Sequence, residues 1–313
     1  MAALTAGELL WWGIAWSAGG APLPFAATYL AMAGGGMAAA IALRRVVQPR
    51  AQPIRWPPLV AGVVLAGIGA SLFLPLKYAI PSEIPFWLDA PLAAAEQSLF
   101  GADPWRLLDR LLGAVLVPVD RLYGLWLPTQ SLVLFLVMLQ PPSPAKSRAL
   151  IAYSLAWFAL GVVAAVAFAS VGPLFYDRLL GTARFAALDE TLRGRGAWVV
   201  LAESDAMWRS LASGRPGFIA GISAFPSLHV AISLWMVLAA RALAPRAAPF
   251  AAAYFAFMWI ASVQLGWHYA SDGLAGAVGL IALWWMAGPL DRRLAERMAP
   301  FGVDASSPYA SEP

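Results

Sequence analysis

The 313-residue sequence contains no cysteine and only two histidines. The absence of cysteine excludes disulfide bonds, thiolate catalysis and cysteine-ligated metal sites. Charged residues are also few, at 12% of the chain, whereas apolar residues make up 61%. The formal net charge is +4, but the arginines are dispersed among the loops between apolar stretches and form no long basic tract, which argues against nucleic-acid binding. This composition is typical of a multi-span membrane protein.

Seven apolar stretches meet or approach the length of about 20 residues that a helix needs to cross a bilayer. They lie at 24–43, 57–76, 122–140, 149–171, 226–243, 249–267 and 273–290. We therefore predict an all-α fold, a polytopic membrane helical bundle of about seven spans, formed by residues 24–298. Residues 1–23 are short of a full crossing and rich in tryptophan, which predicts an interfacial amino-terminal segment. Residues 299–313 are rich in serine and proline and are predicted to be a disordered tail.

The basic residues predict how the bundle is oriented. They gather in alternate connections, namely Arg44, Arg45, Arg50 and Arg55, then Lys146 and Arg148, then Arg241 and Arg246, and finally Arg292, Arg293 and Arg297. The positive-inside rule assigns these connections to the cytoplasmic side. The long connections 77–121 and 172–225, which hold most of the carboxylates, then face outward. Within the first of them, segment 91–121 mixes apolar and charged residues and predicts an amphipathic helix on the outer surface.

The two histidines, His229 and His268, each border a predicted span. A helix descending from about residue 226, a short turn and a return helix ending near residue 267 bring the chain back to the same face, since each leg of roughly 18 residues covers about 27 Å. If the next span starts near His268, Asp272 lies one turn further on and within reach of that imidazole. A histidine oriented by a carboxylate and facing a second histidine offers a nucleophile and a general acid.

Ser227 lies at the predicted amino-terminal end of the same span as His229. Unpaired backbone N–H groups and the helix dipole favour an anion at such an end. Serine is also a preferred residue for capping a helix. Capping without chemistry and contact with a bound phosphate are therefore both open for Ser227.

At these residues the sequence resembles the type 2 phosphatidic acid phosphatase superfamily, in particular its branch of inositol phosphorylceramide synthases. The stretches that carry the resemblance are Ala-Phe-Pro-Ser-Leu-His at 224–229 and Leu-Gly-Trp-His-Tyr-Ala-Ser-Asp-Gly-Leu-Ala-Gly at 265–276. Stretches 99–105 and 172–177 are similar to the same branch. The resemblance implies transfer of a phosphate-containing group through a phosphohistidine, without a cofactor or a metal ion.

Carried over to this sequence, the resemblance makes His268 the nucleophile, Asp272 the residue that holds its reactive tautomer, and His229 the proton donor to the leaving alcohol. Ser227 would bind phosphate oxygens. The implied partners are the membrane and a phospholipid donor, and the acceptor is open: a lipid hydroxyl gives a transferase and water gives a phosphatase. With the predicted orientation, the active site of this integral membrane protein lies on the non-cytoplasmic face.

The sequence departs from the wider superfamily in its phosphate-binding cations. The first motif, which bears a lysine and an arginine, is not found ahead of the fourth span, and Ser262 stands where the third motif usually has an arginine. The synthase branch is similar in lacking these cations. Arg178 and Arg215 on the outer loops, together with Arg184, are candidate replacements, and the competing interpretation is that they are solvated loop charges.

Four other functions remain open at this point. Two histidines and an aspartate could form the facial triad of a metal-dependent oxygenase. A serine hydrolase using Ser227 would lack the Gly-x-Ser-x-Gly elbow. The polar cluster could also relay protons in a transporter or belong to a lipid-binding scaffold, and the transporter interpretation predicts a cavity that continues to the cytoplasmic side.

Overall fold

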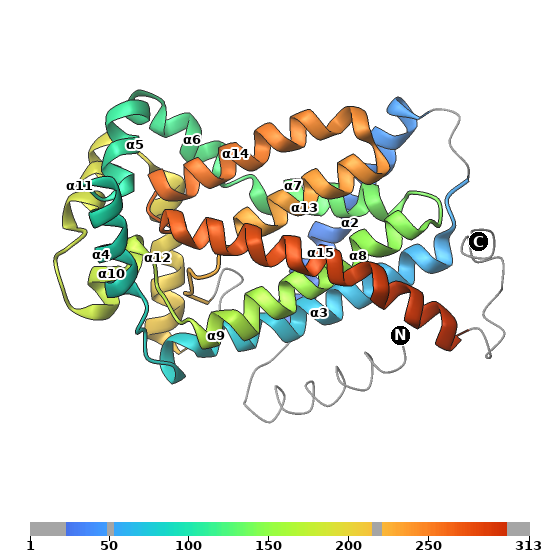
Figure 1. The fold of residues 1–313 in the computed structure, drawn as a ribbon, viewed down its shortest axis with the longest axis horizontal. Coiled ribbons are helices and arrows are strands. Elements are labelled where there is room, and N and C mark those ends of the chain that lie inside the picture. Colours follow the sequence, from blue (N-terminus) through green and yellow to red (C-terminus); the bar gives the residue numbers. More distant parts are fainter. Residues whose placement is uncertain (1–22, 49–52, 215–220, 299–313) are drawn as a thin grey trace.

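The computed structural model describes residues 23–48, 53–214 and 221–298 (Figure 1). Within these ranges the protein is helical and contains no strand, as the composition predicted. The predicted interfacial segment up to residue 22, the predicted tail 299–313 and Arg215 lie outside the described residues.

The bundle consists of long helices that run side by side along the longest axis of the molecule (Figure 1). All seven predicted stretches are largely helical. The helices are α2 (Leu23–Val47), α3 (Trp56–Glu83), α7 (Trp126–Met138), α8 (Pro144–Leu155) with its continuation through the π-helix η2 (Ala156–Ala164) and α9 (Ala165–Ala167), α13 (Leu228–Leu243), η3 (Pro245–Ala247), α14 (Ala248–Gln264) and α15 (Ala270–Met298).

The number of candidate spans is lower than the seven that the sequence predicted. Among the described residues, three helices are long and apolar enough to cross a membrane: Pro144–Ala167, Pro245–Gln264 and Ala270–Arg293. A fourth arises if Pro104–Tyr123 and Trp126–Met138, which are bent by 49° at their junction, count as one broken span. Helix α13 has only 16 residues, short of the length of about 20 that a perpendicular crossing needs. Several apolar helices of this kind are consistent with an integral membrane protein.

A cap of shorter helices covers one end of the bundle, on the left in Figure 1. It contains α4 (Asp89–Phe100), α5 (Pro104–Leu112), the 3-10 turn η1 (Gly113–Val115), α6 (Leu116–Tyr123), α10 (Pro173–Leu180), α11 (Ala186–Arg195) and α12 (Trp198–Ser213). The prediction of one amphipathic helix over 91–121 is therefore wrong. Gly101, with φ of 73°, ends α4 in the left-handed conformation, and Pro104 starts α5 at a position where its missing N–H costs nothing.

Buried polar contacts join the pieces of the cap. The Asp120 carboxylate on α6 accepts hydrogen bonds of 2.8 Å from the backbone N–H groups of Val199 and Val200, in the first turn of α12. Arg184 pairs with Asp103 at 3.0 Å and thereby links the α10–α11 connection to the start of α5. Because the donors at a helix start have no partner within the helix, a buried carboxylate there fixes where the helix begins.

Candidate active site

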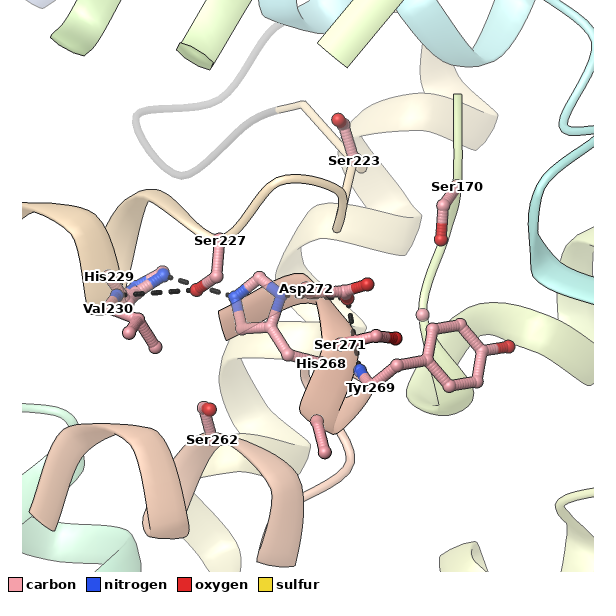
Figure 2. A network of polar contacts seen from close by, with 12 residues as sticks. Ser170, Ser223, Ser227, His229, Val230, Ser262, His268, Tyr269, Ser271 and Asp272 are labelled. Carbon is pink, nitrogen blue, oxygen red and sulfur yellow. Dashed lines mark hydrogen bonds and ion pairs between the residues drawn. The ribbon is translucent and has the colours of Figure 1, made fainter. Parts of the chain in front are cut away.

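The structure brings the two histidines together (Figure 2), and His268 lies next to residues of the cap. His229 lies in the first turn of α13, and His268 lies in the connection between α14 and α15. The His268 Nε2 and His229 Nδ1 atoms are 3.5 Å apart. The helical hairpin α13–α14 therefore returns the chain to the level at which it started, as the lengths of the two legs predicted.

Asp272 lies next to the other nitrogen of the His268 ring. Its Oδ2 atom is 3.3 Å from His268 Nδ1 and accepts a hydrogen bond of 3.0 Å from the Tyr269 N–H. The helix begins at Ala270 and not at His268. Asp272 is therefore the third residue of α15, and its carboxylate accepts from the N–H group just ahead of the helix, as the acidic residue of a capping box does. A hydrogen bond from Nδ1 to the carboxylate leaves the lone pair on Nε2, the atom that faces His229.

Ser227 caps α13 and ties it to α15. Its Oγ accepts a hydrogen bond from the Val230 N–H at 3.3 Å, and its own N–H donates to the Asp272 carbonyl at 3.0 Å. Helix α15 passes so closely that a Cβ at Gly276 would collide with the Ser227 backbone. The capping role is therefore observed, while contact of Ser227 with a phosphate stays a prediction.

Two aromatic rings hold the His229 imidazole. Tyr123 stacks on it, with ring centroids 5.3 Å apart and planes at 25°, and the Trp126 centroid lies at 4.2 Å. Both come from the junction of α6 and α7. Rings packed at these distances restrict rotation of the imidazole and leave its Nδ1 directed at His268.

Lys77 is a residue of this site that the sequence interpretation missed. It lies near the end of α3, and its Nζ donates a hydrogen bond of 3.3 Å to the Ser223 carbonyl, in the loop that leads to His229. Burial, with the positive charge of Lys77 as the second cause, lowers the pKa of His268 to about 3. The imidazole is therefore neutral near pH 7, which is the form that has a free lone pair.

A signal for Lys77 is present in the sequence. The chain contains only two lysines, and this one directly follows an apolar stretch. Ionisable side chains in such places usually have a functional role. Because Lys77 lies far from both histidine motifs along the chain, the sequence does not show that it contacts the loop that leads to His229.

The arginines proposed as phosphate ligands have other partners or lie outside the described residues. Arg178 pairs with Asp205 at 2.8 Å on the surface of the cap. Arg184 pairs with Asp103, and Arg215 is not described. Ser262 is buried, and its hydroxyl donates to the Trp259 carbonyl at 2.8 Å. Phosphate binding by Arg178 and Arg215 stays a prediction.

His268 also borders a small hollow on the side of the cap. Other residues around it include Glu96 from α4, Trp105 from α5 and Pro173 from α10. His268 therefore lies next to helices of the cap. In the described part of the chain, no group of three or more histidine, aspartate or glutamate side chains is arranged to hold a metal ion, which is what the facial-triad alternative requires.

The fold and the site together define an apolar helical bundle in which two imidazoles and a carboxylate meet at one end. The sequence model of the PAP2 superfamily matches residues 93–286, more than half of the chain, and the protein belongs to that superfamily. Members of the superfamily are phosphatases or phosphotransferases. The match confirms the superfamily named in the resemblance. Comparison with curated proteins and with solved structures finds no match.

Proposed function

We propose that this protein is a membrane enzyme that transfers a phosphate-containing headgroup from a phospholipid to a lipid hydroxyl, through a phosphohistidine at His268. The proposal is similar to the reaction of inositol phosphorylceramide synthases. The observation that carries it is the pair of contacts on the His268 ring: Nδ1 against the Asp272 carboxylate and Nε2 against the second imidazole. The match to the PAP2 superfamily supports the same chemistry.

In the first step the Nε2 lone pair of His268 attacks phosphorus and forms an N–P bond. The P–O bond to the leaving alcohol breaks, and its electron pair stays on the oxygen, which takes a proton from His229. The negative charge of the bound phosphate favours the protonated form of His229 that this step requires. The His268 Nε2 and His229 Nδ1 atoms are 3.5 Å apart, so binding has to separate them to admit the phosphate.

In the second step the oxygen of the acceptor hydroxyl attacks phosphorus from the side that the first alcohol has left. The N–P bond breaks, its electron pair returns to Nε2, and the hydroxyl proton passes to His229. Both histidines regain their starting states. Asp272 stays hydrogen-bonded to Nδ1 in both steps and stabilises the positive charge that develops on the ring.

Lys77 supplies the positive charge for the phosphate in this proposal. Three features support this role: its position beside the loop that carries Ser223, its effect on the pKa of His268, and the serine in place of an arginine at position 262. A partly buried cation interacts more strongly with a phosphate than an exposed one does, because less water screens the pair. Backbone N–H groups at the start of α13 add donors.

The active site is proposed to face the non-cytoplasmic side. The cap covers the end of the bundle at which the histidines meet, and the basic turn between α13 and α14 lies at the opposite end (Figure 1). This arrangement supports the orientation that the positive-inside rule predicts.

The decisive experiment uses the purified full-length protein in detergent with a chelator present. Labelled phosphatidylinositol or phosphatidate is supplied with and without ceramide or diacylglycerol. We expect label on the lipid acceptor and an acid-labile phosphorylated intermediate that His268→Ala abolishes. Free labelled phosphate or headgroup phosphate would instead identify water as the acceptor. Turnover that survives His268→Ala, or no turnover with any donor, contradicts the proposal and favours the transporter or scaffold function.

A further inference from the structure

We propose that Asp89 is a positioning residue for His268. Its carboxylate holds residues 169–174, here called the clasp, between the two loops that carry the histidines. The inference rests on the proposed function, because the orientation of His268 matters for turnover only if this residue is the nucleophile.

Asp89 is fully buried at the start of α4 and binds the clasp through both carboxylate oxygens. Oδ2 accepts a hydrogen bond of 2.9 Å from the Val171 N–H. Oδ1 accepts bonds of 3.0 Å from the Gly172 N–H and from the Ser170 hydroxyl. Burial raises the pKa of Asp89, and these hydrogen bonds oppose that rise. The buried carboxylate is thus stabilised by the donors of one short segment, and it fixes the path of that segment.

The clasp in turn binds both histidine loops. Its Ser170 carbonyl accepts a hydrogen bond of 2.7 Å from the Ala224 N–H, ahead of His229. Its Leu174 N–H donates to the Gly266 carbonyl at 2.8 Å, two residues before His268. A movement of the clasp would therefore change the position of each imidazole relative to the other.

Gly172 lies where the clasp passes between these loops. Its φ of 78° is in the left-handed region, which favours glycine. A Cβ at this position would collide with the Trp267 carbonyl and would come within 3.0 Å of the Ala224 Cβ. At Gly172 the clasp is therefore packed tightly between the two loops.

A second contact leads from Asp89 to the residue next to the nucleophile. The Tyr269 hydroxyl lies 3.3 Å from Asp89 Oδ1, and the Tyr269 N–H donates to the Asp272 carboxylate that orients His268. Figure 2 shows Tyr269 and Asp272 on the side of His268 away from His229. Asp89 therefore acts on the His268 ring along two short routes, through the clasp and through Tyr269.

The test measures the His268 ring directly and does not require turnover. Because the chain has only two histidines, a full-length protein with a histidine-free affinity tag and ¹⁵N-labelled imidazoles gives two sets of ring signals, assigned with His268→Gln. We compare Asp89→Asn and Tyr269→Phe with Asp120→Asn. Asp120 is a matched control because it is also buried in the cap and also accepts two backbone N–H bonds.

We expect Asp89→Asn and Tyr269→Phe to shift the ring signals of His268. Both variants should also lower kcat about ten- to a hundredfold with little change in KM, because misplacement of a reacting group slows the chemical step more than it weakens binding. Asp120→Asn should lower the thermal midpoint and leave the His268 signals and kcat near those of the unmodified protein. If Asp89→Asn does not fold, Tyr269→Phe carries the test alone.

The positioning role is overturned if the His268 signals move no further in Asp89→Asn or Tyr269→Phe than they do in Asp120→Asn. So does a loss of kcat that matches the loss of folded protein. If the unmodified protein shows no turnover while the His268 signals respond to Asp89→Asn, the proposed function fails and the structural link stands. The two failures are thereby distinguished.

Discussion

Replacing Lys77 by glutamine tests whether a lysine from α3 serves as the phosphate-binding cation. Glutamine keeps a polar hydrogen-bond donor on a somewhat shorter side chain and removes the charge. In the structure this ammonium lies against the loop that leads to His229 and contributes to the lowered pKa of His268. The substitution should therefore affect both phosphate binding and the titration of the nucleophile.

The expected size of the effect follows from the burial of the site. A charge-assisted hydrogen bond to a phosphate contributes about 2 to 4 kcal/mol when water is excluded, which corresponds to a fall of roughly 30- to 1000-fold in kcat/KM. The pKa of His268 should rise as well, because the Lys77 charge is one of the causes that lower it. The acid limb of the pH profile of kcat/KM should therefore move to higher pH in Lys77→Gln.

The assay is the pH dependence of kcat/KM for the labelled phospholipid donor, with Lys146→Gln as the control. Lys146 is the other lysine of the chain, and its Nζ donates to the Met138 and Gln140 carbonyls at the end of α7. We expect Lys146→Gln to lower the thermal midpoint without changing kcat/KM. A Lys77→Gln protein that keeps kcat/KM within about threefold of the unmodified value and has the same acid limb refutes the reasoning.

Three further predictions concern pH, topology and close packing. The pKa of His268 is about 3 in the folded protein, below its ordinary value of 6.5. Below pH 6.5 the unfolded chain therefore binds a proton that the folded protein does not, and the folded protein loses stability as the pH falls toward 3. At pH 4.5 the loss of stability is about 3 kcal/mol. The difference in thermal midpoint between the unmodified protein and His268→Gln should therefore shrink from pH 7 to pH 4.5. A difference that stays constant contradicts this prediction. The chain has no cysteine, so single cysteines can be introduced to test the orientation. A membrane-impermeant maleimide applied to intact cells should label Ala183→Cys, on the cap, and should not label Ala247→Cys, in the basic turn. The reverse labelling pattern would invert the proposed orientation. Gly276→Ala should reduce turnover and the thermal midpoint together because its Cβ meets the backbone of Ser227, and an unchanged midpoint would show that the two helices can separate freely.

The helical class could be predicted from the sequence, but the number of spans could not. Apolar length and composition are local properties, and the predicted ranges are indeed largely helical. Where a helix bends or ends depends on its neighbours. The junction of α6 and α7 at Gly124 and Leu125 lies in a continuous apolar stretch, and the 49° bend there leaves the two helices as one broken span at most.

The same distinction applies to the site. His229, His268 and Asp272 could be related from the sequence because a single helical hairpin connects them, and the length of its legs determines their common depth. Nothing in the sequence around Lys77 or Asp89 indicates that these residues reach the same loops. Their partners, Ser223 and the clasp, are more than 80 positions away along the chain.

Lys77 and Asp89 both lie on the amino-terminal side of residue 93, where the match to the PAP2 superfamily begins. The matched region contains both histidines and Asp272, whereas a charge that lowers the pKa of His268 and a carboxylate that holds the clasp come from α3 and from the start of α4. Two of the residues that set the environment of the reacting groups therefore lie ahead of the part of the sequence that the superfamily model matches. Substitutions ahead of residue 93 can consequently alter the basicity and the orientation of His268 without changing any residue by which the superfamily is recognised.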